Sequence, residues 1–353
     1  MKNKKKRVIK FICIGLIVFL VISPLLLSYV VYKMNFGNRY ETISWMTRSL
    51  NEFDGLISER YTFESNKGQQ LVGYKYYKEN ESVKGIIVIA HGLGGGGHNS
   101  YMDVANYFAT YGYIVFAYDA TGNDESEGDS VKGIPQGLID LDYAIDFIKG
   151  NDEFDNLPIM LFGHSWGAYS AGSVLNIHPD VKAVVMVAGF NKSLDIMKEE
   201  GRRIMGESII VLMPGFFLLE KIKFGHYSSY NCIDGFEASN AGVMVIQSVD
   251  DKMVSFENHF NVFLNKYQDN TRFNFVQFED RGHDYVYYND ASRQYKNQFD
   301  EQFKDYLNTL NTELTAEIKT AYMNKYLNKT KLFELDTELM GRIVSFYDSY
   351  AKY

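Results

Sequence analysis

Short apolar runs recur along the middle of the chain, with helical stretches between them. They occupy residues 85–90, 113–118, 158–162, 181–187, 243–247 and 273–278. Near-continuous runs rich in Val and Ile are typical of strands that are covered on both faces. Their alternation with helices predicts an α/β fold with a mostly parallel central sheet and helices on both faces. Two earlier β-rich runs flank Asn66-Lys67-Gly68 and predict a hairpin.

Two segments depart from this alternation. Residues 191–240 carry helical pieces in place of a strand, which predicts an insertion that caps one end of the sheet. After the last strand, apolar residues at three- and four-residue steps predict an added helical segment, one long helix or a pair, over residues 289–331. A final amphipathic helix follows Asp336, the expected N-cap.

The first 58 residues differ in composition from the rest. Six of the first ten residues are basic, and residues 11–32 carry no charge. A helix of that length spans the roughly 30 Å hydrocarbon core of a bilayer, and the preceding basic residues predict a cytoplasmic N-terminus. We therefore expect a basic tail (1–10), one transmembrane helix (11–32) that acts as a signal anchor in the cell membrane, a juxtamembrane linker (33–58), and an extracytoplasmic domain (59–353). A cleaved signal peptide is the alternative, but its apolar stretch is normally ~7–15 residues and ends at a small-x-small site, which is absent here.

The charge and cysteine content exclude several classes of function. The formal net charge is −8, and without the six basic residues of the tail the chain has 30 basic against 44 acidic side chains. Such a body repels nucleic acid, so no nucleic-acid partner is expected. Cys13 and Cys232 lie in regions of different character, and C-x-x-C pairs are absent from the sequence. We therefore expect neither a disulfide scaffold nor a Cys-based metal site.

A G-x-S-x-G motif is the first candidate for chemistry. Gly163-His164-Ser165-Trp166-Gly167 directly follows the apolar run 158–162 and precedes a helical stretch. This strand-turn-helix placement is typical of a nucleophile elbow, in which a strained turn exposes the serine hydroxyl. The two flanking glycines, Gly163 and Gly167, let the strand and the helix pack closely. Ser165 is therefore the candidate nucleophile.

A serine hydroxyl becomes a good nucleophile only when a base takes its proton and a third group orients that base. His283 lies just after the last predicted strand, where a loop can carry its imidazole back over the sheet. Asp250 and Asp251 follow the preceding strand, and either could orient the imidazole. Serine, aspartate and histidine in that order along the chain are typical of one hydrolase fold.

Acyl transfer also requires two N–H donors for the developing oxyanion. His91-Gly92-Leu93 and the glycines 94–97 follow the run 85–90, and the glycines leave backbone amides free of side-chain cover. The patterns of a phosphate-binding or dinucleotide-binding loop are absent from the sequence. We expect the amides of Leu93 and Trp166 to be the two donors.

Together these motifs resemble the α/β-hydrolase superfamily, and within it the branch of monoacylglycerol lipase-like esterases and S33-type serine aminopeptidases. Residues 119–128 are similar to the D-x-x-G-x-G-x-S-x-G loop of that branch. Asp124 stands where the branch has its second glycine, and Thr121 stands where it usually has Arg, which puts the conformation of this loop in question. The resemblance covers residues 61–284 and the final helix, but neither the N-terminal anchor nor the added helix after Asn289.

The resemblance implies an α/β-hydrolase fold with a helical cap at 191–240 that shapes an acyl pocket. It also favours Asp251 over Asp250, because related hydrolases place the acid three residues after a small residue, here Ser248, and three before a branched apolar one, here Val254. The implied activity is hydrolysis of a small-molecule carboxylic ester, lipid-like or with a small acyl group, through an acyl-enzyme, without a cofactor or metal. A serine peptidase or aminopeptidase of the same fold and a non-catalytic binding protein are the alternatives.

Overall fold

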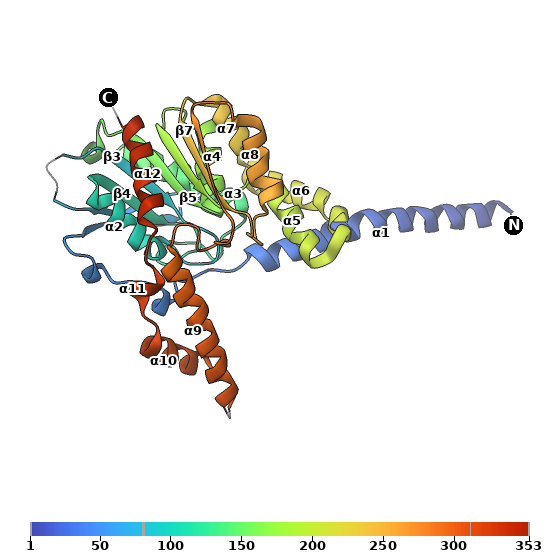
Figure 1. Cartoon of the computed structure of the whole chain (residues 1–353). Helices are drawn as coiled ribbons and strands as arrows, with labels where there is room; N and C mark the ends of the chain where they lie inside the picture. The colour runs from blue at the N-terminus through green and yellow to red at the C-terminus, as the bar shows by residue number, and fades with distance from the viewer. Residues whose placement is uncertain (1, 80–81, 311, 352–353) are drawn as a thin grey trace.

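The computed structural model describes residues 2–79, 82–310 and 312–351. Within them a central sheet of eight strands has the order β1-β2-β4-β3-β5-β6-β7-β8 (Figure 1). The strands are β1 (Ile57–Glu64), β2 (Gln70–Tyr77), β3 (Gly85–Ala90), β4 (Tyr113–Asp119), β5 (Ile159–His164), β6 (Ala183–Val187), β7 (Gly242–Ser248) and β8 (Phe273–Phe278). The pairs β1–β2 and β2–β4 are antiparallel, and all other neighbours are parallel. The predicted hairpin and the mostly parallel sheet are confirmed.

Helices cover both faces of the sheet, as the apolar runs predicted. Alternate residues of a strand face opposite sides, so Ile86 and Val88 of β3 lie in one core cluster while Ile87 and Ile89 lie in the other. One face is covered by α3 (Ile134–Lys149), α4 (Trp166–Ser173), α7 (Cys232–Ala238) and α8 (Asn261–Tyr267). The other is covered by α2 (Met102–Thr110) and α12 (Thr337–Tyr350).

The insertion between β6 and β7 is helical, and its last helix belongs to the core. It contains α5 (Ser193–Met205), η6 (Gly206–Val211), α6 (Met213–Phe224) and η7 (Gly225–Ser229), followed by α7. Phe236 of α7 is fully buried and contacts Phe263 and Phe273 edge to face. The cap therefore ends before α7, because this helix packs on the sheet face and not over its end.

The N-terminal segment is a single helix, α1 (Lys2–Phe36), whose first half projects from the body (Figure 1). Its last turns bury Ser28 and Tyr32 against the cap, and the Ser28 hydroxyl donates to the carbonyl of Leu212 at 3.0 Å. Among the helices of the described residues, none combines the length and the apolarity needed to cross a membrane. The predicted transmembrane helix 11–32 is therefore not supported, and part of that run packs against protein.

Short helices precede the sheet, and an added group of helices follows it. The expected linker contains η1 (Ser44–Met46) and η2 (Leu50–Glu52) and ends where β1 begins at Ile57. The added C-terminal segment is a helical pair and a short helix, namely α9 (Asp290–Thr309), α10 (Ala316–Tyr326) and α11 (Lys329–Leu332). Tyr306 and Tyr322 stack between the pair, with ring centroids 4.3 Å apart. The pair projects from the body beyond α11 (Figure 1).

The final helix completes the core, as its apolar stripe predicted. Asp336 caps α12 by accepting the N–H groups of Glu338 and Leu339, both at 3.0 Å. Ile343 and Tyr347 are fully buried, and the Tyr347 hydroxyl donates to the carbonyl of Leu161 in β5 at 2.7 Å. The last helix therefore supports the strand that precedes the candidate nucleophile.

We expect Ile343→Ala to lower the free energy of unfolding by about 2–5 kcal/mol, because the substitution leaves a cavity beneath β5. The matched control is Arg342→Ala on the exposed face of the same helix, which should change it by less than about 0.5 kcal/mol. Urea denaturation of both variants measures the difference. Equal stability of the two variants would show that α12 does not support the core.

Candidate active site

Ser165 occupies a strained turn between β5 and α4. Its backbone has φ 55° and ψ −113°, in the region that side chains rarely adopt, and its N–H donates to the carbonyl of Val187 at 2.8 Å. A Cβ on Gly163 would lie 2.3 Å from the carbonyl oxygen of Gly167, and a Cβ on Gly167 would lie 1.9 Å from that of Ala90. Only glycine fits at these two positions, which explains the spacing of the motif.

The structure brings Ser165, His283 and Asp251 together from three separate loops. The Nε2 atom of His283 lies 2.9 Å from the Ser165 hydroxyl, and its Nδ1 atom lies 2.8 Å from a carboxylate oxygen of Asp251. Because a carboxylate only accepts, Nδ1 carries the proton and Nε2 is free to accept the serine proton. This is the arrangement by which a base activates an alcohol nucleophile.

The two adjacent aspartates have different partners. Asp251 is buried, and its second carboxylate oxygen accepts the N–H groups of Met253 and Val254 at 2.8 and 2.9 Å. Asp250 instead accepts the N–H of Gly282 at 2.8 Å, and so supports the loop that carries the histidine. The structure therefore places Asp251 against His283, as expected from the resemblance to related hydrolases.

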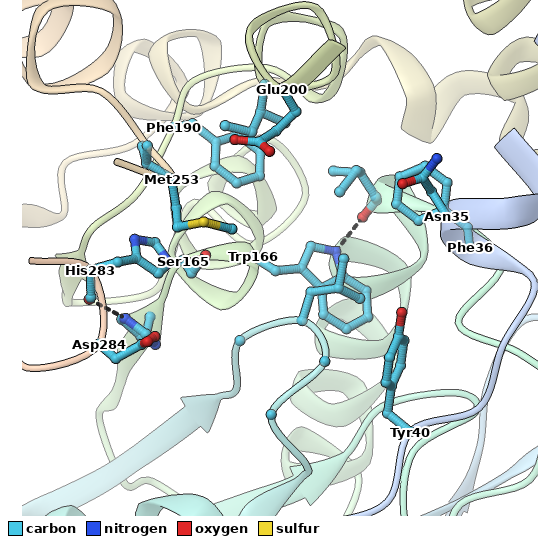
Figure 2. A pocket seen from close by; sticks show the side chains of 18 of the residues that line it. Asn35, Phe36, Tyr40, Ser165, Trp166, Phe190, Glu200, Met253, His283 and Asp284 are labelled. Carbon is cyan, nitrogen blue, oxygen red and sulfur yellow. Dashed lines mark hydrogen bonds between the residues drawn. The ribbon is translucent and has the colours of Figure 1, made fainter. Parts of the chain in front are cut away.

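The two expected oxyanion donors line the same pocket as Ser165. Leu93 lies in the loop after β3, and no acceptor among the described residues takes its N–H. Trp166 is the first residue of α4, where backbone N–H groups have no partner within the helix. Its indole N–H donates to the carbonyl of Ile134 at 2.7 Å, which fixes the side chain beside the nucleophile (Figure 2). His91, the first residue of the loop after β3, is buried, and its Nε2 accepts the N–H of Ala120 at 3.0 Å.

Tyr101 and His164 connect the loop after β3 with the loop that carries His283, a connection that no sequence pattern predicted. The N–H of Gly92 donates to the Tyr101 hydroxyl at 3.0 Å, and that hydroxyl lies 3.1 Å from Nδ1 of His164. Nε2 of His164 lies 3.0 Å from the backbone carbonyl of His283 and must therefore donate to it. Burial, together with the nearby His283, lowers the pKa of His164 to about 4, so its ring is neutral. These hydrogen bonds hold the loop after β3 in a fixed position relative to the loop that carries His283.

Two groups of side chains in the described part of the chain are close enough to hold a metal ion. In the first, His164, His283 and Asp284, every ring nitrogen already has a partner in the protein. In the second, Asp142, Asp146 and His178, the imidazole bonds to Asp142 at 2.7 Å and to the Lys149 ammonium at 3.0 Å. All three imidazole rings are thus used in hydrogen bonds, and neither group offers a set of free ligands.

A cavity of about 1010 Å³ opens above Ser165 and is lined mainly by apolar side chains (Figure 2). The cap forms one wall, as the resemblance implied, with Ile196, Met197, Ile204, Ile209 and Phe216. A second part of the wall comes from the N-terminal segment, with Val31, Tyr32, Phe36, Tyr40, Ile43 and Met46. No expectation from the sequence placed the N-terminal segment at the site.

Known proteins resemble this chain in sequence and in fold. Residues 81–231 match the family described as Serine aminopeptidase, S33. Caffeoylshikimate esterase of Arabidopsis thaliana is 26% identical over 132 residues, which are 35% of this chain and 38% of that protein. Monoglyceride lipase of Mus musculus is 30% identical over 105 residues, which are 29% of this chain and 33% of that protein. The chain thus matches only about a third of the length of these curated relatives.

The likeness of the fold extends further than the likeness of sequence. An esterase from Pyrococcus furiosus superposes with a TM-score of 0.54 at 15% identity, over 77% of this chain and 97% of that one. At this identity the superposition shows the α/β-hydrolase fold alone. With the family match, it confirms the resemblance to the monoacylglycerol lipase-like and S33-type branch of the α/β hydrolases.

We expect Asp251→Asn to lower the turnover of p-nitrophenyl acetate by ~10⁴, because the amide no longer holds His283 in the tautomer that accepts the serine proton. Asp250→Asn is the matched control, since it makes the same change one residue away, and it should cost less than about tenfold because one hydrogen bond to a loop is lost. Steady-state kinetics on the two purified variants compares them. A larger loss in the Asp250 variant would contradict the assignment.

Proposed function

We propose that this protein, which has the α/β-hydrolase fold, hydrolyses carboxylic esters through an acyl-enzyme formed on Ser165. One observation carries the proposal: the hydrogen-bonded series Ser165, His283 and Asp251 lies at the base of a large apolar cavity. The named relatives that match the sequence include an esterase and a lipase, which supports ester hydrolysis over other chemistry of the fold.

In the proposed reaction each of these groups has a role. As the Ser165 Oγ atom attacks the ester carbonyl, His283 Nε2 takes its proton, and the Asp251 carboxylate stabilises the imidazolium. The N–H groups of Leu93 and Trp166 donate to the oxyanion. The C–O bond to the leaving alcohol then breaks, and His283 returns the proton to that alcohol. A water molecule, activated by the same imidazole, releases the acid and regenerates the serine.

The apolar walls of the cavity favour a substrate with a hydrocarbon chain. Burial of apolar surface contributes about 25 cal/mol per Å², or about 0.8 kcal/mol per methylene group. A chain of several carbons in this cavity therefore gains more from burial than a polar acyl group does. We propose a lipid-like or medium-chain acyl ester as the preferred substrate.

One observation favours a second candidate, an aminopeptidase. Glu200 lines the cavity, and one of its carboxylate oxygens is buried without a hydrogen-bond partner in the described part of the protein. Its other oxygen pairs with Arg203. A free, buried carboxylate oxygen near the nucleophile could accept the α-ammonium group of a peptide.

We expect Ser165→Ala to abolish labelling by a fluorophosphonate probe and to lower ester turnover by several orders of magnitude, because binding and oxyanion stabilisation alone leave only ~10³–10⁴ over water. Ser170→Ala, in the same helix, is the matched control and should label normally. A panel of p-nitrophenyl esters beside aminoacyl-p-nitroanilides separates the esterase from the aminopeptidase. A folded wild-type protein that takes no label would instead be a non-catalytic binding protein.

The location of the protein is a separate proposal that rests on the sequence. We propose that the uncharged run 11–32 attaches the chain to the cell membrane and that the basic tail keeps the N-terminus in the cytoplasm, with the hydrolase domain outside. The described helices give no membrane-spanning candidate in support.

Protease added to intact cells or spheroplasts should therefore degrade the hydrolase domain, because an outward-facing domain is accessible there. An immunoblot follows the domain, and inverted membrane vesicles, in which it should be protected, are the control. Protection in intact cells together with degradation in inverted vesicles would reverse the proposed orientation. Recovery of the chain in the soluble fraction would refute the attachment.

A further inference from the structure

The N-terminal segment that follows α1 crosses directly over the glycine loop of the active site. We call residues 39–46 the strap. Its side chains Tyr40, Ile43 and Met46 line the cavity, next to Phe36 at the end of α1. The strap lies outside residues 81–231, the part that matches the family.

Asp124 fastens the strap to the glycine loop. One of its carboxylate oxygens accepts the backbone N–H of Thr42, and the other accepts both the Thr42 hydroxyl and, at 2.8 Å, the N–H of Gly97. Its own backbone N–H donates to the carbonyl of Tyr40 at 3.0 Å. These hydrogen bonds lower the pKa of Asp124 despite its partial burial, so the carboxylate is ionised and its bonds are charge-assisted.

The glycine loop leaves room for the strap. A Cβ on Gly96 would lie 2.8 Å from the Cα atom of Thr42, and one on Gly94 would lie 3.7 Å from the Tyr40 ring. Both glycines have positive φ, 84° for Gly94 and 97° for Gly96. The run of glycines therefore serves two purposes, because it exposes backbone amides to the pocket and also accepts the strap at close range.

Contacts at both ends keep the strap in place. The Arg39 guanidinium donates to the carbonyls of Asp124 at 2.7 Å and Ser126 at 3.0 Å. At the other end, the Lys329 ammonium of α11 donates to the carbonyls of Ser44 at 3.1 Å and Thr47 at 2.6 Å. A segment without helix or strand over residues 39–43 is thus fixed against both the core and the C-terminal addition.

We propose that the strap is the specificity-determining wall of the cavity for the acyl chain and that Asp124 is the positioning residue that holds it there. The inference rests on the proposed ester hydrolysis. A short acyl group remains beside Ser165 and does not reach the strap, whereas a longer chain packs against it. Loosening the strap therefore weakens the reaction of long-chain esters and spares that of short ones.

The test compares Asp124→Asn with wild type on p-nitrophenyl esters from acetate to dodecanoate. Asparagine keeps the size of the side chain, but its NH₂ group cannot accept an N–H, so one side of the fastening is lost. The ratio of kcat/KM for decanoate to that for acetate should fall at least tenfold, mainly through KM. Glu125→Gln is the matched control, because it neutralises the adjacent carboxylate, which bonds to Arg60 and Tyr74 and not to the strap; its ratio should equal that of wild type.

Two further variants cover the case in which Asp124→Asn fails to fold. Thr42→Val preserves shape and removes the hydroxyl donor, and Tyr40→Ala removes cavity wall without touching the fastening; both should lower the same ratio. In the double variant of Asp124→Asn with Thr42→Val, the second change should add little, because both substitutions disrupt the same contact, between Asp124 and Thr42. Unchanged ratios in these variants, or an equal loss for every chain length, would overturn the inference.

Failure of the inference can be told from failure of the proposed function. Rates of labelling by a short-chain and a long-chain alkyl fluorophosphonate report the same chain-length preference without ester turnover. A wild-type protein that takes neither probe would end the proposed function and this inference with it. Labelling of all variants at wild-type rates by both probes would end only the inference.

Discussion

The close approach of strand β3 to helix α4 is the constraint on which the site depends. The carbonyl of Ala90 lies where a side chain on Gly167 would be, and Gly163 meets the backbone of Gly167 in the same way. This contact forces Ser165 into its positive-φ turn. It also fixes where the loop after β3 begins relative to Ser165, so one backbone approach positions both the Ser165 hydroxyl and the two amides that we propose as oxyanion donors.

Local patterns sufficed to predict the sheet and the central residues of the site. The carboxyl ends of parallel strands meet at one edge of a sheet, so side chains that follow β5, β7 and β8 converge whatever their distance in sequence. Ser165, Asp251 and His283 occupy those three positions and do meet. The selection of Asp251 over Asp250 came instead from the resemblance to related hydrolases, in which the acid stands three residues before a branched apolar residue, here the buried Val254.

Contacts between distant segments could not be predicted in this way. The sequence of an uncharged run does not distinguish a helix that faces lipid from one that packs on protein. The burial of Ser28 and Tyr32 against the cap therefore could not be predicted from the periodicity of α1. The end of the cap was also missed, because the sequence of α7 does not distinguish it from a cap helix, and the structure is needed to show that Cys232 and Phe236 are fully buried in the core. Tyr101 contacts His164 although they are 63 residues apart in the sequence, and no motif spacing predicts this contact.

Asp124 stands where related hydrolases have a glycine, and only the structure explains this difference. At φ 37° the residue lies where glycine is favoured, and a left-handed backbone costs a side chain roughly 1–2 kcal/mol. Hydrogen bonds to a charged acceptor each contribute about 1.5–3 kcal/mol, and Asp124 accepts three. The gain exceeds the strain as long as Thr42 and Gly97 supply the donors. The aspartate in the loop and the strap above it therefore depend on each other, because without Thr42 of the strap only the N–H of Gly97 would remain as a donor to the carboxylate.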